Sequence, residues 1–350
     1  MPISAPPSTT SSAGEHDPGV ASARARAEAI ERSTPALARV GDTRIRFGTA
    51  SWTDRTLIAP GVFYPDRATT PEARLRYYAS IFSVVEVDST YYALPARRVA
   101  ELWAERTPSD FVFDVKAFGW MTGHATETER LPRALREALP NELAKKKRLY
   151  AKDVPREVRE EAWRLFADAI RPLHDEGKLG AVFLQFPSWV RPAAHSPEML
   201  ARARRRLGDL PIAVEFRHHA WLAPAQRDRT MGLLRDNEMS YVVVDEPQGF
   251  ASSVPPDTAV TSPRLAVVRL HGRRGETWEK QGTSVLERFR YLYSSAELSP
   301  WVPKIVEIGG EAEQVHVVFN NCYGNYGTTN ALEMAHLVTS LLSSTSSGKG

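Results

Sequence analysis

The stretch of residues 84–92 constrains the fold most, because its two side-chain parities differ in kind. It reads Val-Val-Glu-Val-Asp-Ser-Thr-Tyr-Tyr, with Glu86, Asp88 and Thr90 on one parity and valines on the other. β-Branched residues with a period of two indicate a β-strand, in which alternate side chains point to opposite faces. The sequence therefore predicts a strand with one acidic face.

Four further predicted strands also carry their charged residues at their carboxyl-terminal ends. An edge strand with one face in solvent would explain the charged face of a single strand. The same pattern in five strands indicates instead that these strands belong to one common arrangement. The charged residues of these four strands are Asp114 and Lys116, Glu215 and Arg217, Asp245, and Arg269 with His271.

Eight predicted strands alternate with predicted helices along the chain. Strand–helix–strand units give parallel strands with right-handed crossovers. The alternative is an open doubly wound sheet, which usually has a glycine-rich first turn; residues 51–54 read Ser-Trp-Thr-Asp instead. The predicted fold class is therefore α/β, a closed (β/α)8 TIM-like barrel of parallel strands.

The predicted barrel forms a single domain over residues 43–343, with an insertion near residues 125–153. Residues 1–42 are rich in Ser, Thr, Pro and Ala, which predicts a disordered tail with at most a transient helix at residues 22–31. Residues 344–350 are predicted to form a second disordered tail. Residues 246–263 are rich in Pro and Ser, so a loop is expected to replace one helix there.

Charge and cysteine content narrow the class of protein. The net charge is only +3, and the basic residues fall mostly on predicted helices, which favours solvated helix faces over a nucleic-acid stripe. One cysteine, Cys322, fits a reducing compartment, so we expect a cytoplasmic protein. We expect no membrane span, because no run of about 18 apolar residues occurs. The oligomeric state is not predicted.

In a barrel, the polar parity of each strand faces the axis near the carboxyl-terminal strand ends, where barrel enzymes place their chemistry. Five of the expected interior groups are carboxylates, and three are cations, so two acids have no basic partner. A purely structural ion-pair network, which is the alternative, should balance better. The expected interior residues are Glu86, Asp88, Asp114, Lys116, Gln185, Glu215, Arg217, Asp245, Arg269 and His271.

These groups suit acid–base catalysis on a small polar substrate, phosphorylated or carboxylated, by hydrolysis or isomerisation. The predicted catalytic residues are Glu86, Lys116, Glu215, Asp245 and His271. Glu215 or Asp245 would act as acid or base, His271 would move a proton, and the cations would neutralise charge. No cofactor is predicted, although Glu86, Glu215, Asp245 and His271 are the ligand candidates if a divalent metal binds.

Two loops after the last strands favour an anion. Residues 271–275 contain Arg273 among glycines, and residues 319–330 supply glycines, amides and hydroxyls before a helix amino terminus. Barrels often hold phosphate at this place. A non-catalytic binding or adaptor protein, associated with nucleic acid through its basic helices, is the alternative of a different class.

Motifs along residues 43–342 resemble the YecE-like family, the domain of unknown function 72. They are 47–52, 61–65, 85–95, 103–108, 110–116, 185–187, 214–218, 268–272, 319–321 and 330–332. The resemblance implies an eight-stranded α/β barrel and no established activity. The family commonly has a glycine where this chain has Ser51. With the expected interior positions, the resemblance gives these substrate-binding candidates: Trp52, Asp88, Thr90, His124, Gln185, Arg217, Arg269, Arg273, Asn320 and Asn321.

Overall fold

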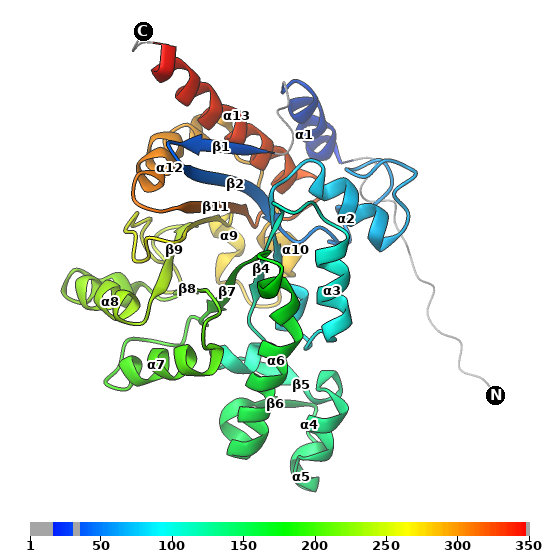
Figure 1. The fold of residues 1–350 in the computed structure, drawn as a ribbon, viewed down its shortest axis with the longest axis vertical. Helices are drawn as coiled ribbons and strands as arrows, with labels where there is room; N and C mark the ends of the chain where they lie inside the picture. The colour runs from blue at the N-terminus through cyan, green and yellow to red at the C-terminus, as the bar shows by residue number, and fades with distance from the viewer. Residues whose placement is uncertain (1–16, 31–35, 348–350) are drawn as a thin grey trace.

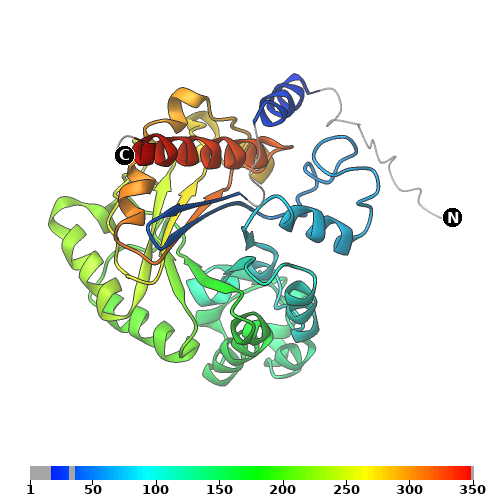
Figure 2. The same cartoon turned by 45° about the horizontal axis from the view of Figure 1, so that its top comes forward.

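The computed structural model describes residues 17–30 and 36–347. In this part of the chain, eight parallel strands close into a barrel, because β11 pairs with β2 and β2 pairs with β3 (Figure 1 and Figure 2). The predicted barrel is confirmed. In barrel order the strands are β2 (Thr43–Ala50), β3 (Val84–Val87), β4 (Val112–Lys116), β7 (Leu179–Gln185), β8 (Ile212–Glu215), β9 (Met239–Asp245), β10 (Ala266–Leu270) and β11 (Gln314–Phe319).

Helices surround the barrel in Figure 2, one after most strands. Between β9 and β10 the described chain has no helix, as the Pro- and Ser-rich segment predicts. Short helices α9 (Gly275–Trp278), α10 (Val285–Arg288) and α11 (Ser295–Leu298) follow β10. The long helices are α2 (Pro71–Ala79), α3 (Arg97–Glu105), α6 (Arg156–Asp175), α7 (Ser196–Leu207), α8 (Pro224–Asp236), α12 (Trp301–Gly309) and α13 (Tyr326–Ser347).

The outward parity of the strands forms the main core. Val85, Val87 and Val115 are almost completely buried in the hydrophobic cluster between strands and helices. Helix α2 begins with the Thr70 hydroxyl accepting from the Ala73 N–H at 3.1 Å and with Pro71 in the first turn. Helix α7 begins at Ser196, and His195 holds its cap position.

The prediction of a disordered amino-terminal tail is wrong for the described part of residues 17–42. Strand β1 (Leu37–Val40) pairs antiparallel with the first half of β2, whose second half pairs with β3. Helix α1 (Pro18–Glu28) packs on α13, where Arg26 pairs with Glu333 at 2.7 Å (Figure 1). The remainder of this predicted tail, residues 1–16 and 31–35, lies outside the described residues.

The carboxyl-terminal tail prediction is also wrong in part, because α13 continues through residues 344–347. A helix of small and apolar residues continues there because no Gly or Pro interrupts it before Gly348. Residues 348–350 lie outside the described residues. Among those described, no helix combines the length and apolar character needed to cross a bilayer.

Residues 125–153 form a small lobe beside the barrel, at the bottom of Figure 1. Strands β5 (Ala125–Glu127) and β6 (Arg148–Tyr150) pair antiparallel, and α4 (Arg133–Glu137) and α5 (Asn141–Ala144) lie between them. Leu135 and Leu149 are buried, and the Trp120 indole donates to the Leu149 carbonyl at 2.9 Å. Because Leu135 and Leu149 belong to the same hydrophobic cluster as the barrel residues, the lobe is anchored to the barrel. The 3-10 turns are η1 (Ser89–Tyr91), η2 (Gly119–Thr122), η3 (Thr128–Arg130), η4 (Ala151–Asp153) and η5 (His219–Leu222).

Candidate functional site

A cleft of about 560 Å³ opens at the carboxyl-terminal ends of the strands. This is the end of a barrel where the loops can vary while the strands stay fixed. Its walls include the aromatic residues Tyr91, Trp189, Trp278 and Phe289. Seven of the sequence-predicted site residues also line it: Asp88, Lys116, His124, Gln185, Arg217, Arg269 and Asn320.

Arg269 lies at the centre of the cleft floor. Strand register places it beside Val244 and Val318, on the face that points to the axis. Its Nε and Nη2 donate to the two oxygens of Glu86 at 2.8 and 2.7 Å, and its Nη1 donates to Glu215 at 2.7 Å. One buried guanidinium therefore holds two buried carboxylates from opposite parts of the barrel.

Glu215 is the second centre of this network. Its Oε1 accepts from Gln185 Nε2 at 2.7 Å and lies 3.2 Å from Arg217 Nη1 and from His271 Nε2. Burial alone would raise the pKa of Glu215, but the charges and hydrogen bonds of Arg269, His271 and Arg217 hold it well below its usual range. Glu215 is therefore a fixed negative charge.

His271 is neutral, because complete burial lowers its pKa to about 3 against the opposing effect of Glu215. Its Nδ1 lies 2.9 Å from Asn320 Nδ2. Since the amide nitrogen donates, the network assigns the ring proton to Nε2, which points at Glu215. His271 therefore orients Glu215 in this state.

Lys116 and Asp88 differ from the groups below them, because they face the cleft without a pairing side chain. No described residue accepts a hydrogen bond from the Lys116 ammonium, which lies 5.0 Å from the centre of the Tyr91 ring. Burial, and next to it the charge of Arg269, lowers the pKa of Lys116. Burial raises the pKa of Asp88, against the opposing effect of Lys116. Both pKa values are therefore shifted in the direction of neutral pH.

Asp245 does not face the axis, so its predicted interior placement is wrong. It pairs in register with Leu270, on the face opposite to Val244 and Arg269. Its carboxylate instead binds Arg273 at 2.8 and 2.6 Å and accepts from the Trp301 indole at 2.6 Å. The ion pair also draws Arg273 away from the cleft, where it was expected.

Glu246 is the interior carboxyl group that the sequence reading missed. It is buried, its Oε1 accepts from the Val254 N–H at 2.7 Å, and its Oε2 lies 3.4 Å from Arg217. Burial raises the pKa of Glu246 to about 7. Side-chain alternation could have found Glu246. Val244 lies beside the inward-facing Arg269, and Glu246, two residues further along, therefore faces the axis as well.

Other predicted residues have structural contacts away from the cleft. Trp52 packs edge-on against Trp103 and Phe113 in the core. The Thr90 hydroxyl donates to the Lys116 carbonyl at 2.6 Å, so it fixes the end of β4. Asn321 donates to Asn330 at 2.8 Å.

The acidic residue Asp114 lies deeper in the barrel, where His316 Nδ1 is 3.0 Å from both of its oxygens. His316 is almost completely buried and pairs in register with Arg46 on the same face. Asp114 therefore has His316 as a partner and does not count among the carboxyl groups of the cleft. The remaining carboxyl groups are Glu86, Asp88, Glu215 and Glu246. Four carboxyl groups there face three cations, so the excess acidity is smaller than the sequence predicted.

The expected anion loop after β11 is covered by α1. The Asn325 amide donates to the Val20 carbonyl at 3.1 Å, and the Thr329 hydroxyl donates to the Ala23 carbonyl at 3.0 Å. The Gly324 N–H donates to the Thr56 hydroxyl at 2.7 Å. These contacts occupy the hydrogen-bond donors that would otherwise bind an anion at the start of α13.

The candidate metal ligands do not converge on one point. In residues 17–30 and 36–347, no group of three His, Cys, Asp or Glu side chains is arranged to hold a metal ion. Asp245 points to the other face, and the Arg269 guanidinium supplies the positive charge between Glu86 and Glu215.

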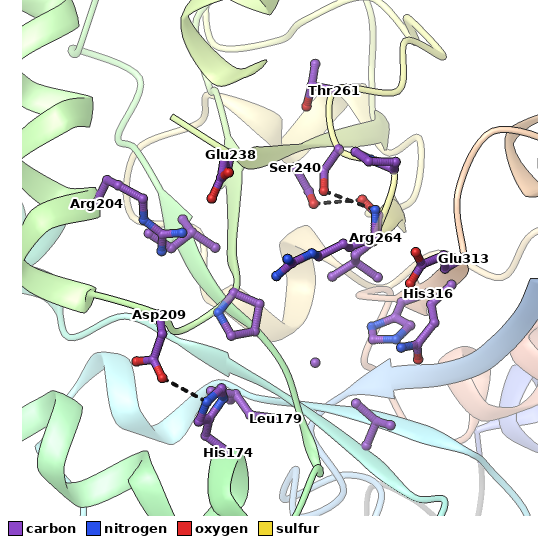
Figure 3. A pocket seen from close by; sticks show the side chains of 18 of the residues that line it. His174, Leu179, Arg204, Asp209, Glu238, Ser240, Thr261, Arg264, Glu313 and His316 are labelled. Carbon is purple, nitrogen blue, oxygen red and sulfur yellow. Dashed lines mark hydrogen bonds and ion pairs between the residues drawn. The ribbon is translucent and has the colours of Figure 1, made fainter. Parts of the chain in front are cut away.

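Two other hollows lie away from this network. Figure 3 shows a cavity of about 740 Å³ at the amino-terminal strand ends, where His174 pairs with Asp209 at 3.2 Å. A groove of about 710 Å³ beside the inserted lobe has many arginines. Three of these, Arg202, Arg205 and Arg206, pair with glutamates, which reduces the positive charge of the groove.

Comparisons with known proteins identify the family of this chain and agree with its fold. The family described as "Protein of unknown function DUF72" matches residues 46–348. The "UPF0759 protein YunF" of Bacillus subtilis is 30% identical over 297 residues, covering 84% of this chain and 94% of that protein. A DUF72 family protein from Enterococcus faecalis has 27% identity over 84% of this chain and 95% of its own, with a TM-score of 0.67. One from Thermotoga maritima has 29% identity over 83% and 97%, with a TM-score of 0.64.

Proposed function

The chain belongs to the DUF72 family, whose name states no reaction, and we propose from the cleft itself that the protein is an acid–base enzyme. The family resemblance expected from the motifs is thereby confirmed. In this proposal, Lys116 and Asp88 transfer protons on a small polar substrate that carries an anionic group. The reaction is an isomerisation through proton transfer at carbon, and hydrolysis is the alternative reaction type.

The observation that carries the proposal is the open state of Lys116 and Asp88. Both line the cleft, and no described side chain hydrogen-bonds to the Lys116 ammonium or to the Asp88 carboxyl group. The pKa of Lys116 is lowered by burial and that of Asp88 is raised by burial. Catalytic acids and bases work best when their pKa lies near the operating pH. A structural ion-pair network would have joined these two groups to partners.

The groups below them have a supporting role. Glu86 and Glu215 are held by Arg269, and His271 is held by Asn320 and Glu215. Their charges are fixed before a substrate arrives, so no reorganisation is needed as charge develops. We therefore assign positioning roles to Glu86, Glu215 and His271, in place of the catalytic roles expected from the sequence.

Arg217 is the group we assign to an anionic part of the substrate. Its contacts to Glu215, His271 and Glu246 all use Nη1, while the ring of Trp278 lies 4.6 Å from its guanidinium carbon. In the described residues, its Nη2 and Nε have no hydrogen-bond acceptor. A planar guanidinium with free donors suits a carboxylate or a phosphate. A volume of about 560 Å³ fits a small molecule.

The test is solvent isotope exchange in a pool of metabolites. The protein is incubated with the pool in D2O, and mass spectrometry detects metabolites that gain deuterium at carbon. Lys116→Met should abolish the gain, and Asp88→Asn should slow it about 100-fold or more. Lys152→Met is the matched control, because that ammonium lies 5.5 Å from the centre of the Tyr150 ring on the inserted lobe. Exchange that survives Lys116→Met refutes the proposal, and incorporation of oxygen from labelled water without deuterium gain identifies hydrolysis.

A further inference from the structure

Arg269 and Lys116 are the two cations near Glu86, but only Arg269 hydrogen-bonds to it. Among the described residues, the Lys116 ammonium is left without a carboxylate partner. Arg269 uses Nε and Nη2 to occupy both oxygens of Glu86, at 2.8 and 2.7 Å. A guanidinium matches a carboxylate in this two-point geometry better than an ammonium does. Glu86 therefore influences Lys116 through its charge without accepting its hydrogen bond.

The remaining surroundings of Lys116 also favour a reactive amine. The ring of Tyr91 lies on one side, 5.0 Å from Nζ to the ring centre, and the neighbouring His124 is neutral because burial lowers its pKa to about 4. Beside Lys116 in register lies Phe183. Burial and the nearby charge of Arg269 make this amine lose its proton more easily than an amine in water, against the attraction of the Tyr91 ring for the charged form.

We infer that Lys116 is a nucleophile that forms an imine with an aldehyde or ketone substrate bearing a carboxylate or phosphate. This inference rests on the proposed function and narrows its substrate class to carbonyl compounds. It assigns Lys116 a covalent role, whereas proton transfer alone would need no carbonyl group.

The step balances without a redox partner. The lone pair of Nζ attacks the carbonyl carbon, a C–N bond forms, and the carbonyl oxygen takes a proton. Asp88 in its protonated form then gives a second proton to that oxygen, the C–O bond breaks, and water leaves. The first proton on that oxygen comes from nitrogen, which keeps its other proton, so the neutral amine, the carbonyl and protonated Asp88 yield a protonated imine, water and ionised Asp88.

An imine also explains why a lysine belongs at this position in an isomerase. The protonated imine attracts electrons more strongly than the carbonyl does, which acidifies the neighbouring C–H bond. Asp88, once ionised, is placed in the same cleft to take that proton. Arg217 lies in the same cleft for the anionic group.

The experiment traps the imine with cyanoborohydride at pH 7. The probes are glyceraldehyde 3-phosphate, dihydroxyacetone phosphate, pyruvate and uncharged glyceraldehyde, and peptide mass mapping locates the reduced adduct. At least one anionic probe should label Lys116 about tenfold faster than the exposed Lys280, and faster than glyceraldehyde does. Lys116→Arg keeps a positive charge and should lose the adduct, while Lys280→Arg should keep it.

A substrate-independent measurement accompanies the trapping. Trace labelling with acetic anhydride at pH 7 compares the reactivity of Lys116 with that of Lys280 in the folded protein. Slower acetylation of Lys116, or no adduct with any probe, overturns the imine. If deuterium exchange still depends on Lys116 in that case, the proposed function stands with Lys116 as a simple base. If exchange is also absent, both fail.

Discussion

Arg269 binds both carboxylate oxygens of Glu86 although the two residues are 183 positions apart in the chain. Nε and Nη2 of the guanidinium each take one oxygen, and Nη1 is left for Glu215. All three side chains are almost completely buried. In the described part of the chain, this pairing decides which charged groups of the cleft are held by a partner and which are left without one.

Removing Arg269 should strongly destabilise the protein. Arg269→Met leaves Glu86 and Glu215 as buried carboxylates without their cation, which costs about 3–5 kcal/mol of unfolding free energy. Urea unfolding measures the loss. Arg98→Met removes the exposed pairs with Glu101 and Glu105, which are screened by solvent, and should change the free energy of unfolding far less. Equal losses in the two variants would contradict the central role of Arg269.

Glu246 should make the protein less stable as the pH rises. Burial raises its pKa from 4.5 to about 7, so the folded state holds a proton that the unfolded state has lost. The stabilisation is complete below pH 4.5 and is lost as the pH rises through about 7, with an upper limit of about 3 kcal/mol.

Glu246→Gln is the variant that checks this dependence, because Gln retains an oxygen to accept from the Val254 N–H. Urea unfolding at pH 5 and pH 8 compares it with the unchanged protein. The difference in stability between the two proteins should shift in favour of the variant at pH 8. A difference that is the same at both pH values would show that Glu246 is ionised throughout.

Asp245→Asn should affect stability more than isotope exchange. The carboxylate lies on the helix side of the barrel, where it pairs with Arg273 and accepts from Trp301. An amide keeps one acceptor but leaves the Arg273 charge uncompensated, so we expect a loss of about 2–3 kcal/mol. Deuterium exchange at a temperature where the variant is folded should stay within threefold of the unchanged protein. Loss of exchange in the folded variant would place Asp245 in the chemistry.

Ser51→Gly should stabilise the protein. Ser51 has φ of 104°, a backbone conformation that suits glycine and strains a residue with a Cβ. Relief of backbone strain is expected to raise the unfolding free energy by roughly 0.5–1 kcal/mol. Thermal unfolding provides the measurement, and Ser51→Ala, which keeps a Cβ, is the control. Equal effects of Gly and Ala would trace the change to the hydroxyl, which accepts from the Thr53 N–H.

The inward placement of Glu86, Lys116, Glu215 and Arg269 was predictable from the sequence, because each lies within a strand of unbroken alternation. The same rule failed for Asp245, because the residues before it read Tyr-Val-Val-Val and show no polar–apolar alternation that marks an inward face. The parity of Arg269 in the neighbouring strand was needed to show that Glu246 faces the axis instead. Alternation alone gives two faces and does not say which of them is inward.

By itself, the sequence determined the closed barrel and the gathering of charged side chains at one end of it. The reason is that strand periodicity and strand–helix alternation are local properties of the chain. Only the tertiary structure decided that Arg269 takes Glu86 and leaves Lys116 without a carboxylate partner, and that α1 covers the loop before α13. Those outcomes depend on distances between distant segments, which closure of the barrel alone brings together.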